Sequence, residues 1–260
     1  MSAPVANGIC LSVTQLDACW ELLGLGDAPC TLSLPSPGRT WSERRQVLAG
    51  VLEQLGQLGL ADGAVPGEKL ASPLRLLAGP DYQVDLRFGG DLVDTAVAIG
   101  AVAGSEGVVL VRSGEDVVVR RMRSARMLPT LLGLLPPLRA GVGRSVNIPA
   151  DMYDDARGAT VDGNLWTMAD HLVAGGLPRL DAGSWVRMCT GIRSFGQLGT
   201  TFRPGGDIRF GPWVIGFHGT DSGYYLQLRR PAPGGATVTM CPLEQARLYQ
   251  LTEELLADGY

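Results

Sequence analysis

Hydrophobic and polar residues alternate along two long stretches of the chain, and each stretch ends in an amphipathic helical pattern. A period of two is typical of strands with one buried face, whereas apolar residues three and four apart indicate a helix. The first stretch predicts four strands and a helix, at Tyr82–Phe88, Thr95–Ala103, Gly107–Arg112, Asp116–Met122 and Ser124–Leu135. The second predicts the same succession, at Ser194–Arg203, Trp213–Gly219, Ser222–Arg230, Ala236–Met240 and Pro242–Leu256. The repetition predicts a duplicated platform with pseudo-two-fold symmetry.

Further elements are predicted ahead of the first stretch. A short strand is expected at Ile9–Val13, followed by a helix with Thr14 as its N-cap. Thr40 and Glu43 have the spacing of a capping box, in which each side chain bonds the backbone amide of the other. The apolar stripe of the first helix consists of Leu16, Cys19, Trp20 and Leu23. A third helix is predicted at Glu68–Ala78, with Ser72 as a later alternative start because Pro73 lies inside it.

The fold class follows from how these elements are grouped. The strand connections are too short for crossover helices, so the strands form antiparallel meanders. Ahead of the second stretch, helices are predicted at Pro149–Arg157, Gly163–Ala174 and Arg179–Thr190. Helices grouped beside an antiparallel sheet make an α+β protein, with a central sheet from two related halves flanked by helical bundles. We expect a single domain over residues 1–260, with halves of about 1–140 and 141–260 joined near Arg139–Arg144.

Composition excludes several classes of protein. Hydrophobic residues make up 45% of the chain and the net charge is -4, which is typical of a soluble globular protein and offers no basic face for nucleic acid. No apolar run approaches the roughly 20 residues that span a bilayer, so no membrane insertion is expected. The first eight residues lack the charge and apolar core of a signal peptide, which predicts a cytoplasmic protein. The odd number of cysteines, five, favours reduced thiols over disulfides or a zinc site.

Catalytic patterns are also missing. The two histidines, His171 and His218, do not have the spacing of a metal pair. Gly219–Gly223 lies in a predicted hairpin and places its serine one position too late for a nucleophile elbow. Lys69 is the single lysine. The sequence therefore predicts a protein that is not an enzyme and uses no cofactor or metal.

Several motifs, in order along nearly the whole chain, resemble the EspG family of actinobacterial ESX (type VII) secretion. They are Leu16–Leu25, Leu32–Thr40, Leu76–Pro80 leading into Tyr82–Phe88, Gly143–Pro149, Asp221–Tyr225, Leu228–Arg230 and Val238–Pro242 with the closing helix. The resemblance implies a cytosolic, substrate-specific chaperone. Such a chaperone binds the apolar tip of the PPE subunit in PE–PPE heterodimers and keeps the pair soluble for export.

The resemblance also implies where the partner binds. The family uses a loop between early sheet strands together with its C-terminal half, and that loop corresponds most nearly to Gly89–Asp94. The expected partner contacts are Asp91, Leu92, Trp213, Phe217 and Tyr225, since large aromatic residues are favoured interface anchors. An alternative for Trp213 and Phe217 is that they pack beneath the chain's own helices.

Two other functions stay open, and so does the oligomeric state. The chain could be an interaction module for another apolar helical partner, or an enzyme with an unrecognised site near His218. A bare binding face or exposed sheet edge could also let the free protein form a homodimer.

Overall fold

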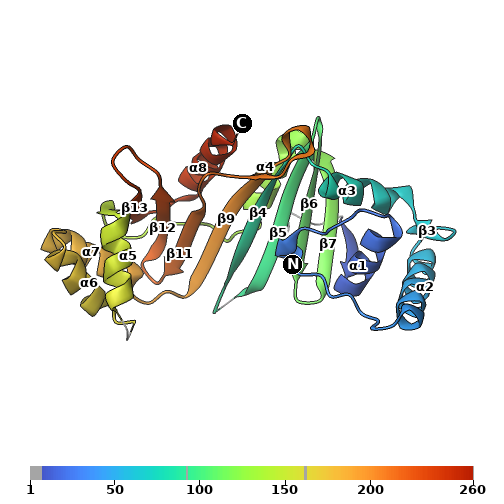
Figure 1. Cartoon of the computed structure of the whole chain (residues 1–260), viewed down its shortest axis with the longest axis horizontal. Helices are drawn as coiled ribbons and strands as arrows, with labels where there is room; N and C mark the ends of the chain where they lie inside the picture. Colours follow the sequence, from blue (N-terminus) through green and yellow to red (C-terminus); the bar gives the residue numbers. More distant parts are fainter. Residues whose placement is uncertain (1–7, 92, 161–162, 260) are drawn as a thin grey trace. The chain divides into compact units, whose positions relative to one another are not determined.

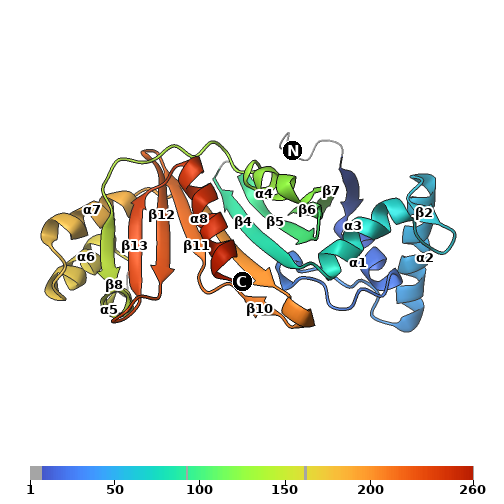
Figure 2. The same ribbon diagram turned by 90° about the horizontal axis from the view of Figure 1, so that it is seen from above.

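The structure is a computed structural model that describes residues 8–91, 93–160 and 163–259. The chain divides into two compact units, which are treated separately (Figures 1 and 2). The first unit holds the described parts of Met1–Arg87, Thr95–Leu134 and Thr201–Arg209. The second holds those of Phe88–Asp94, Leu135–Thr200 and Phe210–Tyr260. The first unit includes Thr201–Arg209 from the C-terminal half of the chain, and the second includes Phe88–Asp94 from the N-terminal half. The boundary between two halves expected near residue 140 stays a prediction.

The first unit is an antiparallel sheet with helices. Its elements are β1 Ile9–Ser12, α1 Val13–Leu22, η2 Cys30–Leu32, α2 Trp41–Gln57, β2 Ala61–Asp62, β3 Val65–Pro66, α3 Glu68–Ala78, β4 Tyr82–Gly90, β5 Val93–Ala103, β6 Glu106–Ser113, β7 Asp116–Arg123, α4 Ser124–Leu132 and η3 Pro204–Gly206. Its sheet has the strand order β1-β7-β6-β5-β4. The last residues of β4 and the first of β5 belong to the second unit. The four predicted meander strands are confirmed.

Helix α1 begins earlier than predicted. Its N-cap is Ser12, whose hydroxyl accepts from the Gln15 amide at 3.1 Å while Gln15 Oε1 accepts from the Ser12 amide at 2.8 Å. Ser12 and Gln15 thus make the reciprocal capping pair that fixes a helix start, and the N-cap predicted at Thr14 is wrong. The capping box of Thr40 and Glu43 is confirmed at the start of α2. Helix α3 begins at Glu68 in spite of Pro73.

The second unit repeats the succession of meander and helix. Its elements are β8 Val146–Pro149, α5 Ala150–Ala159, α6 Leu165–Ala174, α7 Arg179–Cys189, β9 Ser194–Phe202, β11 Ile215–Thr220, β12 Gly223–Arg230, β13 Thr237–Pro242 and α8 Gln245–Asp258. Its strand order is β9-β11-β12-β13-β8, and the two-residue strand β10, Arg209–Phe210, pairs with β9. Strand β8 was not predicted. It has only four residues and ends in proline, so the alternation of apolar and polar residues is too short to recognise.

Helices α5, α6 and α7 lie together beside β8 and β13 in both views (Figures 1 and 2). Their shared core includes Met168, Leu172, Trp185, Met188 and Tyr225, each at most 6% exposed. Helix α8 begins at Gln245 instead of Pro242, because β13 continues through Pro242. The predicted α+β class, with antiparallel strand pairing and packed helices, is confirmed.

An ion pair between α1 and α2 is nearly buried in the first unit. Arg44 Nη1 lies 2.7 Å from Asp17 Oδ2, and the two side chains are 11% and 9% exposed. Arg44 Nε also donates to Glu21 Oε2 at 2.7 Å, and Nη1 donates to the Pro37 carbonyl at 3.1 Å. A single guanidinium thereby connects two helices and the loop between them.

Replacing Arg44 should destabilise the protein strongly. Arg44→Ala leaves Asp17 buried without its cation, which typically costs about 3 kcal/mol or more of unfolding free energy. Arg75→Ala is the matched control, because Arg75 pairs with Glu68 where both side chains are more than half exposed, and such pairs contribute about 0–1 kcal/mol. Urea unfolding followed by circular dichroism measures both. If both variants lost the same unfolding free energy, the buried ion pair would stabilise the protein no more than the exposed one.

Candidate functional site

Four of the predicted partner residues, Asp91, Trp213, Phe217 and Tyr225, belong to the second unit. Asp91 is exposed in the turn after β4, where its amide donates to the Arg193 carbonyl at 2.8 Å. Leu92 lies outside the described residues. The structure therefore places Asp91 beside the start of β9.

Trp213 and Tyr225 are buried, at 6% and 1% exposure. The Trp213 indole donates to Asp258 Oδ2 at 3.0 Å, and the Arg230 guanidinium lies 3.9 Å from the centre of its ring. The Tyr225 hydroxyl donates to the Val142 carbonyl at 3.1 Å. Both rings have partners within the chain and little surface to offer, so their role as contacts stays a prediction. For Trp213, packing against α8 agrees with the alternative stated above.

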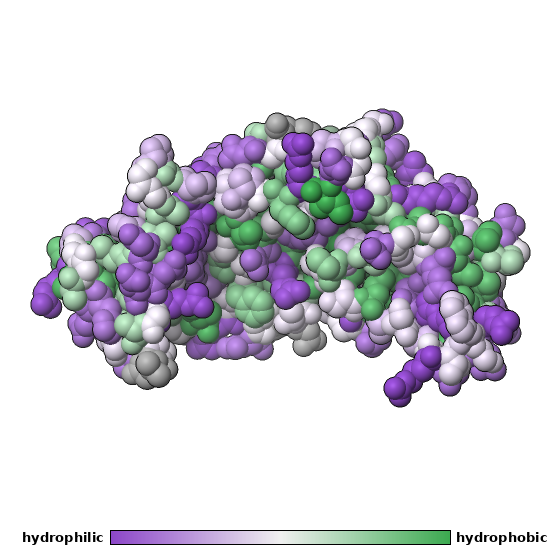
Figure 3. All heavy atoms as spheres, viewed as in Figure 1, coloured by the Kyte–Doolittle hydropathy of each residue, from purple (hydrophilic) through white to green (hydrophobic). Residues whose placement is uncertain are grey.

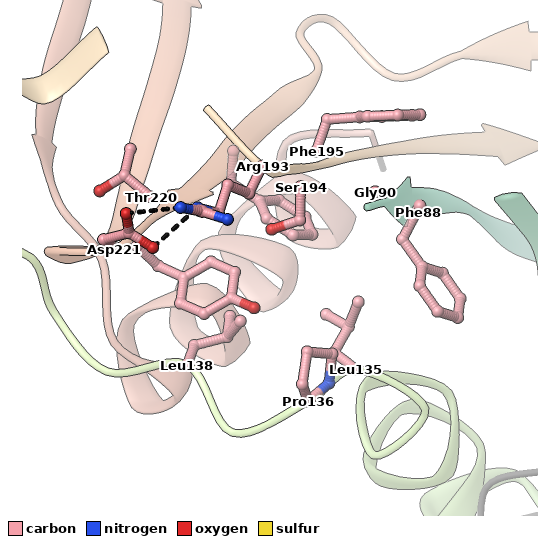
Figure 4. A pocket seen from close by; sticks show the side chains of 14 residues that line it. Phe88, Gly90, Leu135, Pro136, Leu138, Arg193, Ser194, Phe195, Thr220 and Asp221 are labelled. Atoms are coloured by element: carbon pink, nitrogen blue, oxygen red, sulfur yellow. Dashed lines mark hydrogen bonds and ion pairs between the residues drawn. The ribbon is translucent and has the colours of Figure 1, made fainter. Parts of the chain in front are cut away.

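Phe217 differs because it faces a hollow, although it is only 5% exposed. The hollow measures about 290 Å³ and opens where β9, β11 and β12 meet the tip of β4 (Figure 4). Its lining residues are Phe88, Gly89, Gly90, Leu135, Pro136, Leu138, Arg193, Ser194, Phe195, Phe217, Gly219, Thr220, Asp221 and Tyr224. Most of this lining is apolar, so the hollow suits an apolar group better than a polar substrate.

Aromatic rings lie directly over glycines in and beside the hollow. A Cβ atom added to Gly196 would stand 1.9 Å from the Phe217 ring, and one added to Gly219 would stand 2.8 Å from the Tyr224 ring. Gly196 is opposite Phe217 in the β9–β11 register, and Gly219 is opposite Tyr224 in the β11–β12 register. The absence of side chains at these two positions lets the rings form the floor of the hollow.

The rim of the hollow is charged and its surroundings are apolar. Arg193 Nε and Nη2 donate to the two carboxylate oxygens of Asp221, at 2.7 and 2.9 Å. Ile192 and Phe195 on either side of this arginine are 51% and 46% exposed. Figure 4 shows the Phe195 ring directed away from Leu135, as expected for a strand residue next to Ser194. Apolar surface is therefore exposed near the start of β9, on both sides of Arg193.

The face drawn in Figure 3 shows no segregation of hydrophobic from hydrophilic residues. Hydrophobic and hydrophilic residues are interspersed over the face drawn in Figure 3. Scattered exposed apolar residues are normal on soluble proteins, so the combination of a hollow and exposed neighbours is more informative than any single residue.

Cys19 and Cys189 are buried and are poor nucleophiles. Burial raises the pKa of the Cys19 and Cys189 thiols to about 12, which keeps them from the reactive thiolate form. Residues 8–91, 93–160 and 163–259 contain no group of three or more His, Cys, Asp or Glu side chains placed to hold a metal. Within those ranges, every helix is too short or too polar to cross a bilayer.

His218 has a structural position. It is 6% exposed, its Nε2 donates to the Met188 carbonyl at 2.8 Å, and its ring centre lies 5.6 Å from that of Tyr225. Burial lowers the pKa of His218, although the bond to Met188 opposes that change. The neutral imidazole therefore ties α7 to the sheet.

Comparison with known proteins gives the family. The EspG family profile matches residues 12–253, which is most of the chain. The chain belongs to the EspG family. The fold of this EspG-family chain is similar to a solved structure of the Mycobacterium tuberculosis type VII secretion system chaperone EspG5 in complex with a PE25–PPE41 dimer. That match has a TM-score of 0.74 and 15% identity, and it covers 97% of this chain and 96% of EspG5. No curated protein sequence matches the chain.

Sequence reasoning missed most of the hollow in this EspG-family chain. Phe88, Leu135 and Tyr224 come from three separate segments, and none stands out from ordinary core residues. Ile192 lies in the short connection between a predicted helix and a strand, and Phe195 is the second residue of that strand. In the sequence, only the presence of two large apolar residues near the charged Arg193 indicated that they are exposed, and such a pattern is a weak indication.

Enlarging Gly196 should disturb the floor of the hollow. Gly196→Ala forces the Phe217 ring aside, and such overpacking costs about 1–3 kcal/mol of unfolding free energy. Gly199→Ala is the matched control in the same strand, because nothing lies within 4 Å of its added Cβ. The control should be unchanged or more stable by up to about 1 kcal/mol. Thermal and urea unfolding compare the two, and a less stable Gly199→Ala variant would count against this packing.

Stability should depend on the protonation of His218. Because its folded pKa is depressed below the ordinary value of about 6.5, the unfolded chain binds the proton more readily. The contribution of His218 to stability is then complete above about pH 6.5 and is lost as the pH falls through the folded pKa. Urea unfolding between pH 5 and 8 should give a shallower pH dependence for His218→Gln than for wild type. A slope in His218→Gln equal to that of wild type would contradict this role.

Proposed function

We propose that this EspG-family chain is a cytoplasmic, non-enzymatic chaperone of type VII secretion that binds the PPE subunit of PE–PPE dimers. The family match over residues 12–253 carries the proposal. The fold it shares with EspG5, whose structure contains a PE25–PPE41 dimer, supports it.

The surface at the start of β9 suits such a partner. Ile192 and Phe195 expose apolar side chains there, and Asp91 follows the tip of β4 beside them. An exposed apolar helical tip aggregates in water, and a complementary apolar surface removes that tendency by covering it. The chain binds its client at this end of the second unit and releases it for export without changing a covalent bond.

Co-expression tests the function directly. The tagged chain, produced with a PE–PPE pair from the same genome, should co-purify with it as a soluble, monodisperse complex. Size-exclusion chromatography with light scattering measures the composition. If none of the pairs binds the wild-type chain, the proposed client class is wrong, and capture of a different helical protein would point to the alternative interaction module.

Charged substitutions test the location. The double variant Ile192→Asp, Phe195→Asp should weaken client binding at least tenfold, because it places two carboxylates where apolar surface is to be buried. Phe210→Asp is the control, since Phe210 is an aromatic residue 78% exposed in the same unit but on β10. Calorimetry with the purified dimer gives the affinities. An equal loss of affinity in Phe210→Asp, or no loss in the double variant, would show that the client binds elsewhere.

A further inference from the structure

The hollow is too small for a helix and large enough for a side chain. An α-helix with its side chains is about 10–12 Å across, whereas the hollow holds about 290 Å³, near the lower end of ligand pockets. Phe88, Leu135 and Leu138 form apolar walls, and Phe217 and Tyr224 form the floor. The occupant that fits is therefore one bulky apolar side chain that projects from a larger partner.

Ser194 marks the interior of the hollow. It lies on the same face of β9 as Gly196, and its hydroxyl stands 2.5 Å from a Cβ atom added to Gly219. In Figure 4 its side chain lies among the lining residues, between Arg193 and the Leu135–Leu138 wall. A larger residue at position 194 would occupy the space that a partner side chain needs.

The charges beside the hollow are unbalanced. Arg193 and Asp221 neutralise each other in a two-point ion pair. Asp91 follows Gly90, which lines the hollow, and its exposed carboxylate has no ion-pair partner among the described residues. A basic residue of the partner would complement this carboxylate.

We infer that the hollow is a specificity pocket for the client, which receives one large apolar side chain from the end of a client helix while Asp91 pairs with a neighbouring Lys or Arg. The inference rests on the proposed function. It adds a rule for choosing among clients: a preferred client carries a bulky apolar residue next to a basic one at its helical tip. Clients without that pair bind less tightly.

Two pairs of variants test the pocket with a PE–PPE dimer that binds the wild-type chain. Ser194→Phe fills the hollow and should weaken binding about tenfold or more, because burial of one large apolar side chain is worth about 1.5–3 kcal/mol. Ala159→Phe, at an exposed position on α5, adds the same ring away from the hollow and should bind like wild type. Asp91→Lys should weaken binding about threefold to fivefold at low salt and much less at 0.5 M salt, as expected for an exposed ion pair. Asp155→Lys, an exposed carboxylate on α5 away from the hollow, makes the same charge change and should have no such effect.

The outcomes separate this inference from the proposed function. Failure of the wild-type chain to bind any PE–PPE dimer rejects the function itself. Wild-type binding that Ser194→Phe leaves intact, with the variant folded by circular dichroism, rejects the pocket alone. Equal effects of Asp91→Lys and Asp155→Lys reject the charge pairing. Restored affinity of Asp91→Lys for a client whose basic tip residue is changed to Glu would identify the paired residue.

Discussion

The arrangement of strands around the hollow depends on aromatic rings that pack directly against glycine backbone. The Phe217 ring occupies the space where Gly196 would carry a side chain, and the Tyr225 ring does the same at Gly141, where an added Cβ would stand 2.2 Å away. Protein interiors are packed too densely to absorb such an overlap without movement. These glycines therefore set how near β9, β11 and the segment after α4 can come to one another. The hollow is the space that remains between them.

The segment after α4 is held by backbone bonds around the β11–β12 turn. The Tyr224 amide donates to the Arg139 carbonyl at 2.8 Å, and the Gly141 amide donates to the Tyr224 carbonyl at 3.1 Å. Gly223, at φ +121°, packs against Gly141 where a Cβ atom would come within 2.7 Å of its backbone. The segment 139–144, near which the two halves are expected to join, is thus anchored next to the wall formed by Leu135 and Leu138. Its glycines are required by close packing.

Local patterns predicted the elements well, because alternation and capping act over a few residues. The meander strands and the capping box at Thr40 follow directly from such patterns. The hollow could not be predicted, since it joins Phe88 to residues more than a hundred positions later, and periodicity carries no information about such pairing. Trp213 and Tyr225 illustrate the same limit. Large aromatic residues are favoured both in interfaces and in cores, and only the fold places these two in a core.

A protein that binds apolar surface must itself stay soluble, and the arrangement around β9 meets both demands. Ile192 and Phe195 are separated by Arg193, whose pairing with Asp221 places fixed charge between them. Phe195 and Ser194 alternate along the strand, and both contribute to the lining of the hollow. The apolar lining of the hollow is recessed, where a projecting side chain reaches it more readily than a flat face does. In the pocket proposed above, shape would discriminate before charge contributes, which favours partners that present a narrow apolar tip.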